Sequence, residues 1–320
     1  MNQKKQARRF GLAFAAFLLT VVLMQFVLGM LIPSVAPGLE TRSWYPFLIS
    51  ALPNYLFGMP VFFFLTRKLP DAKPAGKERY TLSQVMKYVV IGIGTSYLFA
   101  ILGDVLNRPF VDGLGVDENL LEELILNADL VSTVLFVVIL APVMEELLFR
   151  KRFLDKALQF GKTNAVLTGG IAFGLFHLNI PQFVYASALG VFWGMVYVRH
   201  RSFLLVVVLH MITNAVGSLF MPWIAYCVSG GETIGGAFIL VMMALGLVFL
   251  FTERKAFYRA MQDPPEQGKK PSLLWNAGFL VYFLLAAGIF LLAALGAQTL
   301  MEQTASGIIK VGEVSQMIAC

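Results

Sequence analysis

Long apolar runs alternate with short polar segments along the whole chain. The runs lie near residues 10–32, 44–66, 83–103, 130–149, 164–180, 182–198, 203–221, 234–252 and 273–297. Because a helix of about 20 apolar residues crosses a hydrocarbon core of about 30 Å, this pattern predicts an all-α fold, a polytopic integral membrane helical bundle of eight or nine transmembrane helices. Only residues 179–181 separate the fifth and sixth runs, which predicts a tight helical hairpin broken at Pro181.

Composition excludes a soluble protein. Hydrophobic residues make up 58% of the 320 residues and charged residues only 14%, whereas soluble domains carry about 25% charged residues. The net charge of +6 would suggest a nucleic-acid partner only if the bases gathered on one soluble face. They lie instead in short loops between apolar runs, so we expect no nucleic-acid partner and a surface covered by membrane lipids.

The positions of Lys and Arg predict the orientation of the chain. With nine spans and a cytoplasmic N-terminus, every Lys and Arg except Arg42, Arg108 and Lys310 falls on the cytoplasmic side. The positive-inside rule therefore favours a cytoplasmic N-terminus and an outside C-terminus, in the plasma membrane. The first apolar run is longer than the apolar part of a signal peptide, so we expect it to remain as a span.

The motif Glu145-Glu146-Leu-Leu-Phe-Arg150 ends the fourth apolar run. Glu146 and Arg150 are four residues apart, so on a helix they face each other and can form an ion pair. Glu145 is rotated by about 100° from Glu146 and has no such partner. The spacing thus predicts one neutralised and one available carboxylate, although a helix end with an ordinary interfacial salt bridge would give the same pattern.

Two further motifs place polar side chains within apolar runs. Phe173 and His177 are four residues apart in the fifth run, and His210 and Asn214 are four apart in the seventh. A lone histidine on an apolar helix is commonly a hydrogen-bonded core residue, but polar groups at membrane depth are costly and indicate function. We expect His200, which lies between two arginines, to be a loop residue without a role.

Together these residues are sufficient for peptide hydrolysis. A carboxylate and an imidazole, Glu145 and His177, can hold and deprotonate a water molecule. A second imidazole and an amide, His210 and Asn214, can donate hydrogen bonds to the developing oxyanion. No serine or cysteine is placed as a nucleophile, so covalent catalysis is not indicated.

The three motifs, E-E-x-x-x-R, F-x-x-x-H and H-x-x-x-N, in this order on successive membrane helices, resemble those of the CAAX protease and bacteriocin-processing (CPBP, or Abi) family of intramembrane glutamic endopeptidases. The resemblance covers about residues 130–225. It implies a metal-independent protease with Glu145 and His177 on the water and His210 and Asn214 in the oxyanion hole. Glu146, Arg150 and Phe173 are the supporting residues of the same motifs.

The resemblance also implies a membrane-associated protein or peptide as substrate, and no cofactor. It divides the chain into three N-terminal spans with an acidic outer loop (1–129), a protease-like catalytic core (130–225), and C-terminal spans with a tail (226–320). Within the outer loop, the spacing of residues 117–127 predicts an acidic interfacial helix, which is either part of a solvated connector or a lid that faces the substrate.

Other functions remain open at this level. A non-catalytic membrane immunity or scaffold protein would keep the same polar residues as a structural core. A zinc-dependent membrane protease would use Glu145, His177 and His210 as ligands, although H-E-x-x-H is absent. A transporter is disfavoured because no inverted repeat is visible.

One condition follows from the proposed site. We place the turn between the fourth and fifth spans at 161–164. Glu145 and His177 then lie at the same depth along two antiparallel helices only if the fourth helix continues past Arg150 to about residue 160. We therefore expect a continuous helix there.

Overall fold

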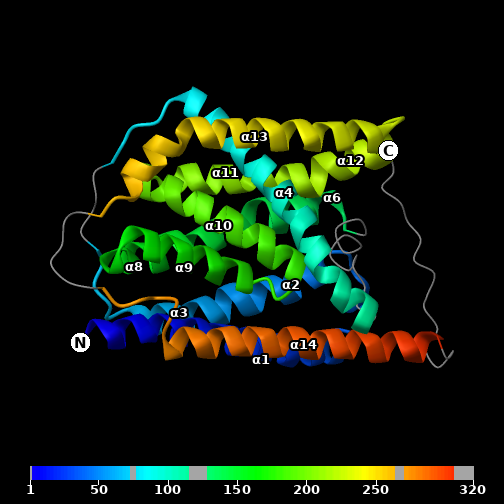
Figure 1. Cartoon of the computed structure of the whole chain (residues 1–320). Helices are drawn as coiled ribbons and strands as arrows, with labels where there is room; N and C mark the ends of the chain where they lie inside the picture. Colours follow the sequence, from blue (N-terminus) through cyan, green and yellow to red (C-terminus); the bar gives the residue numbers. More distant parts are fainter. Residues whose placement is uncertain (1, 73–76, 115–127, 264–269, 306–320) are drawn as a thin grey trace.

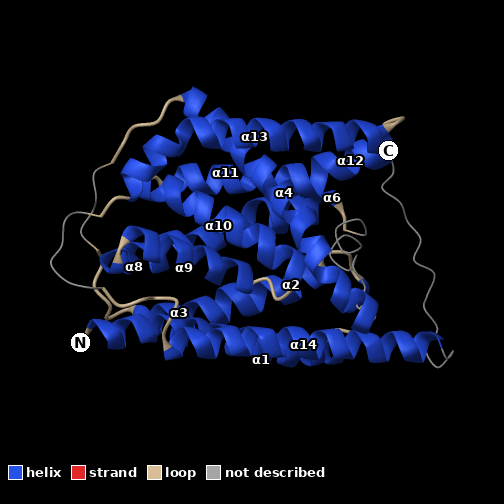
Figure 2. Ribbon diagram, in the orientation of Figure 1, coloured by secondary structure: helices blue, strands red, loops and turns tan. Residues whose placement is uncertain are grey.

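The computed structural model describes residues 2–72, 77–114, 128–263 and 270–305. These residues form a bundle of long helices joined by short loops (Figure 2). In chain order the helices are α1 (Gln3–Val35), α2 (Tyr45–Leu52), α3 (Met59–Thr66), α4 (Leu82–Leu114), α6 (Leu130–Ser132), α7 (Ala141–Glu146), α8 (Asp155–Ala157), α9 (Lys162–Leu175), α10 (Ile180–His200), α11 (Phe203–Ala215), α12 (Met221–Cys227), α13 (Gly231–Met261) and α14 (Ala277–Ala305). The all-α membrane bundle predicted from the sequence is confirmed.

Seven helical stretches in the described residues are long and apolar enough to cross a membrane: Gln3–Val35, Tyr45–Thr66, Leu82–Gly113, Leu130–Phe160, Ile180–His200, Phe203–Cys227 and Gly231–Met261. Several of them join shorter helices through wider π-type turns. The other two apolar runs are helical as well. α9 has only 14 residues, and the apolar helix Ala277–Ala293 is shorter than the seven.

The Leu130–Phe160 helix carries both glutamates of the candidate site. It continues through Arg150 and ends at Phe160, as the geometry of the site requires. Pro142, which lacks an N–H, follows the π-type segment Thr133–Leu140. Gly161, with φ of +100°, then reverses the chain into α9. The predicted turn and the predicted continuous helix are both confirmed.

Close contact between α9 and α10 depends on small residues. A Cβ atom added to Gly190 would lie 2.8 Å from the Cα of Gly170, and one added to Gly174 would overlap the hydroxyl of Ser187. Small residues allow membrane helices to approach at backbone distance. Glycines and other small residues thus form the contact surface of this hairpin.

The hairpin turns just before Pro181, which occupies the first turn of α10. α9 ends at Leu175, several residues before the end of the apolar run, because Leu178 adopts a left-handed conformation with φ of +59°. The Asn179 side chain then caps α10 by accepting a hydrogen bond of 2.8 Å from the backbone N–H of Gln182. His177 therefore lies in the turn, two residues beyond the helix.

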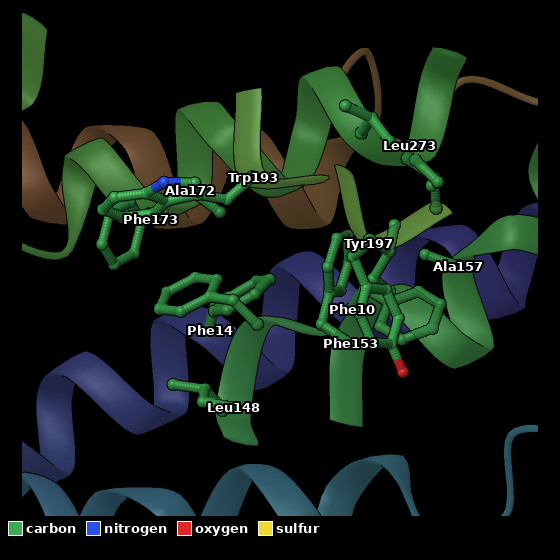
Figure 3. Close-up of a cluster of buried hydrophobic side chains, with 14 of the residues drawn as sticks. Phe10, Phe14, Leu148, Phe153, Ala157, Ala172, Phe173, Trp193, Tyr197 and Leu273 are labelled. Carbon is green, nitrogen blue, oxygen red and sulfur yellow. The ribbon is translucent and has the colours of Figure 1, made fainter. Parts of the chain in front are cut away.

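Aromatic side chains of α1 hold the Leu130–Phe160 helix in the bundle. Phe10 packs edge-on against Phe153 (Figure 3), with 5.2 Å between ring centroids, and Phe14 stacks on Phe149 at 5.7 Å. At one edge of the bundle α1 lies beside α14, and α13 lies at the opposite edge, with α8 to α11 between them (Figure 1). The candidate site is thus surrounded by packed helices.

Three expectations from the sequence are not tested by the described structure. Residues 117–127, expected to form an interfacial helix or a connector, are outside the described residues. The orientation of the bundle in the membrane stays a prediction, as does the division of the chain into three parts.

Candidate active site

The two adjacent carboxylates of the Leu130–Phe160 helix have different surroundings. Glu146 is fully buried and forms an ion pair with Arg150, with 2.9 Å between Oε2 and Nε. Arg150 is also buried, and its guanidinium lies over the rings of Phe173 and Trp193. Glu145 is buried as well, and among the described residues Arg150 forms its ion pair with Glu146 and not with Glu145, as the helical spacing predicts. One carboxylate is therefore neutralised by a cation, and the other is not.

His210 on α11 lies between the two carboxylates. Its Nδ1 is 3.1 Å from Oε1 of Glu146, and its Nε2 is 3.8 Å from Oε2 of Glu145. Because Glu146 is already paired with Arg150, its carboxylate accepts the hydrogen from Nδ1. The sequence predicted His210 near Glu145 but did not predict this hydrogen bond to Glu146.

His177 reaches the site from the turn after α9. Its Nδ1 donates to the backbone carbonyl of Phe173 at 2.9 Å, which leaves Nε2 as the nitrogen available to a water molecule. The ring is only partly buried. No hydrogen bond joins His177 to Glu145 within the part of the chain that the structure describes, so a bridging water is required for the two to act together.

The Phe173 ring links the two imidazoles. Its centroid is 5.1 Å from that of His177 and 5.8 Å from that of His210, and both contacts are edge-on. Because one ring contacts both histidines, His177 and His210 belong to a single site. The F-x-x-x-H spacing thus brings His177 to the same place as the glutamate motif.

Asn214 lies one helical turn beyond His210 on α11. Its side-chain amide donates a 2.9 Å hydrogen bond to the carbonyl of Val137, in the π-type segment that precedes Glu145. An amide nitrogen carries two hydrogens, so one remains for a ligand. The hydrogen bond fixes Asn214 against the helix that supplies both carboxylates.

Three aromatic residues near these groups were not predicted from the sequence. Trp193 of α10 stacks on His210, with 4.3 Å between ring centroids. The side chains of Tyr55 and Tyr185 lie within electrostatic range of Glu145. Aromatic residues in an apolar run are normally core residues, so the sequence carried no signal that would distinguish these three.

The expectation for His200 was wrong. His200 is fully buried at the end of α10, where its Nδ1 donates to the carbonyl of Glu78 at 3.0 Å and its Nε2 lies 2.9 Å from the hydroxyl of Tyr88. The neighbouring Arg199 pairs with Glu78 at 2.7 Å and with Glu253 at 2.8 Å. This polar cluster joins the segment before α4 and the end of α13 to α10. The flanking arginines suggested exposure because the partners are distant in sequence.

A metal does not fit the site as the described residues form it. No group of three His, Cys, Asp or Glu side chains in those residues is arranged to hold a metal ion. The Nδ1 atoms of both histidines are already hydrogen-bonded, and Glu146 is paired with Arg150. The zinc alternative therefore finds no preformed set of ligands here, and we derive no step through a metal.

One known protein family matches the part of the sequence that carries these residues. Residues 127–216 match the family model described as Rce1-like, type II CAAX prenyl endopeptidase Rce1-like. The comparisons with curated proteins and with solved structures gave no match. The matched residues include Glu145, Glu146, His177, His210 and Asn214. Over residues 127–216 the chain is therefore similar to type II CAAX prenyl endopeptidases of the Rce1-like family.

Proposed function

We propose that this protein is an intramembrane endopeptidase that hydrolyses a peptide bond with a water molecule activated by Glu145 and His177. The observation that supports this most strongly is the arrangement of His210, which lies 3.1 Å from Glu146 and 3.8 Å from Glu145 in a buried site. The match of residues 127–216 to a CAAX endopeptidase family points to the same reaction class.

In the proposed reaction, Glu145 accepts a proton from water while Nε2 of His177 orients that water. The water oxygen attacks the carbonyl carbon of the substrate, and the carbonyl becomes an oxyanion. The carbon–nitrogen bond then breaks, and the proton held by Glu145 passes to the leaving nitrogen. A general base of this kind contributes about 10²- to 10⁴-fold to the rate.

The oxyanion would be stabilised by His210 and by the second amide hydrogen of Asn214. Since Nδ1 of His210 donates to Glu146, Nε2 can donate to an oxyanion only when the ring carries two protons. The role of His210 therefore requires an imidazolium during the step in which the oxyanion forms. The Glu146 carboxylate and the oxyanion itself are the negative charges that face this imidazolium, because Glu145 is protonated in that step.

The substrate class follows from the family description and from the membrane location. We propose a membrane-associated protein or peptide, and a prenylated C-terminal peptide of the CAAX type is the first to test. A non-catalytic immunity or scaffold role is the alternative, because His177 and Asn214 each have an internal hydrogen-bond partner, as residues of a structural core do.

The test is cleavage of an internally quenched, farnesylated CAAX peptide by the full-length protein in liposomes. We expect turnover by the wild type and a loss of about 10²- to 10⁴-fold in Glu145→Gln. Glu232→Gln, at the exposed start of α13, is the control and should retain turnover. The scaffold alternative predicts instead that Glu145→Gln lowers the thermal stability and that no variant differs from the wild type in turnover.

The same assay separates the metal-independent mechanism from the zinc alternative. We expect turnover to persist after prolonged incubation with a strong chelator, because no proposed step uses a metal. Lasting inhibition by the chelator, reversed by added zinc, would contradict the proposal. An unprenylated peptide of the same sequence shows whether the farnesyl group contributes to recognition.

A further inference from the structure

Trp193 contacts His210 more closely than any other ring described in the site. The indole stacks on the imidazole with 4.3 Å between centroids and 30° between planes. Trp193 lies on α10, which supplies none of the predicted catalytic residues, and its side chain is fully buried. Phe173 meets the same imidazole edge-on (Figure 3 shows Phe173 and Trp193 in the buried cluster).

Hydrogen bonding alone leaves the imidazole free to tilt. The bond from Nδ1 to Glu146 fixes one ring atom, but the torsion that rotates a histidine ring has broad minima. A flat aromatic surface restricts that rotation because tilting the imidazole would break the stack. The position of Nε2 relative to Glu145 therefore depends on Trp193 as well as on Glu146.

Packing alone does not explain an indole at this position. Nε1 of Trp193 is buried and has no hydrogen-bond partner among the described residues, although buried indoles usually have one. An unpaired buried N–H costs free energy, and a phenylalanine would avoid that cost while filling most of the space. The backbone of α4 closes the other side, since a Cβ atom added to Gly92 would lie 3.8 Å from Nε1.

We propose that Trp193 is a positioning residue for the reaction, one that holds the plane of His210 so that Nε2 faces the reacting carbonyl. This inference rests on the proposed function, because His210 must act on the substrate for its orientation to matter. Trp193 is fully buried and stacks on His210, so we expect it to act through His210 and not by contact with water or substrate.

The kinetic test uses the farnesylated CAAX peptide and two variants, Trp193→Phe and Trp193→Leu. Loss of the aromatic face in Trp193→Leu should lower kcat between about ten- and a hundredfold, since small errors in the position of a catalytic group have effects of that size. KM should stay unchanged because no substrate contact is lost. Trp193→Phe keeps a flat but smaller ring, so its kcat should lie between those of the wild type and Trp193→Leu.

Phe192→Leu is the matched control. Phe192 is the neighbouring residue on α10, is equally buried, and packs against Tyr88 and Phe257 instead of His210. It should lower thermal stability about as much as Trp193→Leu but leave kcat unchanged. Equal losses of kcat in both leucine variants, or an unchanged kcat in Trp193→Leu, would overturn the proposal.

A spectroscopic measurement tests the orientation without turnover. The chain has only three histidines, so ¹⁵N-histidine spectra of the full-length protein can be assigned with His200→Gln and His210→Asn. We expect the His210 nitrogens to shift and broaden in Trp193→Leu, to shift less in Trp193→Phe, and to stay in place in Phe192→Leu. Unchanged His210 signals in Trp193→Leu would refute the positioning role. Absence of wild-type cleavage with shifted signals would refute the proposed function and leave the packing of His210 on Trp193 standing.

Discussion

At the scale of single residues, two neighbouring glutamates have different partners, and the proposed mechanism gives them different roles for that reason. Glu146 faces Arg150 and His210, at 2.9 and 3.1 Å, and cannot take part in proton transfer without losing both contacts. Glu145 has His210 at 3.8 Å and forms no ion pair with a Lys or Arg among the described residues. The structure thus separates a carboxylate that holds the site together from one that can serve as a base.

The buried pair is expected to be essential for folding. Arg150→Met leaves Glu146 buried without its cation, and breaking such a pair costs about 3–5 kcal/mol. Thermal unfolding of the purified protein measures this loss. Lys151→Met is the control, because Lys151 is exposed and also pairs with a carboxylate four residues away, Asp155, at 3.8 Å. An exposed ion pair of this kind contributes about 0–1 kcal/mol to the free energy of unfolding.

A double replacement tests the electrostatic explanation. Glu146→Gln with Arg150→Met removes both charges, so it should be more stable than Arg150→Met alone. If the double variant is as unstable as the single one, lost packing and not the uncompensated charge is the cause.

The sequence predicts contacts of this kind only when they are local. Helical spacing alone indicated that Glu146 faces Arg150, because both lie on one helix. The hydrogen bond between His210 and Glu146 spans 64 positions and depends on how α11 packs against the Leu130–Phe160 helix. The stack of Trp193 on His210 was missed for the same reason.

At the scale of helices, the hairpin of α9 and α10 places His177 and Phe173. Gly190 lies against Gly170 and Phe173, so the ring that contacts both histidines is held at a close contact between α9 and α10. Hydropathy predicted the hairpin but extended its first helix to residue 180. The apolar residues Phe176 and Leu178 continue the pattern beyond Leu175, although the backbone has already left the helix.

Gly190→Ala tests this dependence. The added methyl group would lie 2.8 Å from the Gly170 backbone and 3.1 Å from the Phe173 ring. We expect a loss of about 1–3 kcal/mol in stability, as overpacking causes, together with reduced turnover because Phe173 must shift.

Gly236→Ala on α13 is the control, since an added Cβ there meets nothing within 4 Å. It should leave turnover unchanged. Thermal unfolding and peptide cleavage measured on both variants check the prediction, and wild-type behaviour of Gly190→Ala in both assays would contradict it.

At the scale of the whole molecule, polar contacts gather at the end of the bundle where α10 meets α11. Arg201 pairs with Asp155 at 2.8 Å, Lys156 with Asp71 at 2.8 Å, and Arg199 with Glu78. The same end carries most of the basic loops that the positive-inside rule assigns to the cytoplasm. Composition and hydropathy were sufficient to predict a membrane bundle, because both depend on the chain's total apolar content. The tertiary partners of the basic residues required the structure.

Reporter fusions test the predicted orientation. A phosphatase fused after Ser202, between α10 and α11, should be inactive because it stays in the cytoplasm. The same reporter fused after Ser229, between α12 and α13, should be exported and active. The opposite pattern would reverse the orientation and with it the side from which substrates approach.

The central claim is that Glu145 and His177 act on one water molecule. A double-mutant cycle in the peptide-cleavage assay tests it most directly, using Glu145→Gln, His177→Ala and the combined variant, each shown by thermal unfolding to be folded. Residues that act as a unit have non-additive effects. We expect each single variant to cleave the peptide about 10²-fold or more slowly than the wild type. The combined variant should be no slower than the slower of the two single variants. Losses that multiply, or turnover near that of the wild type in either single variant, would contradict it.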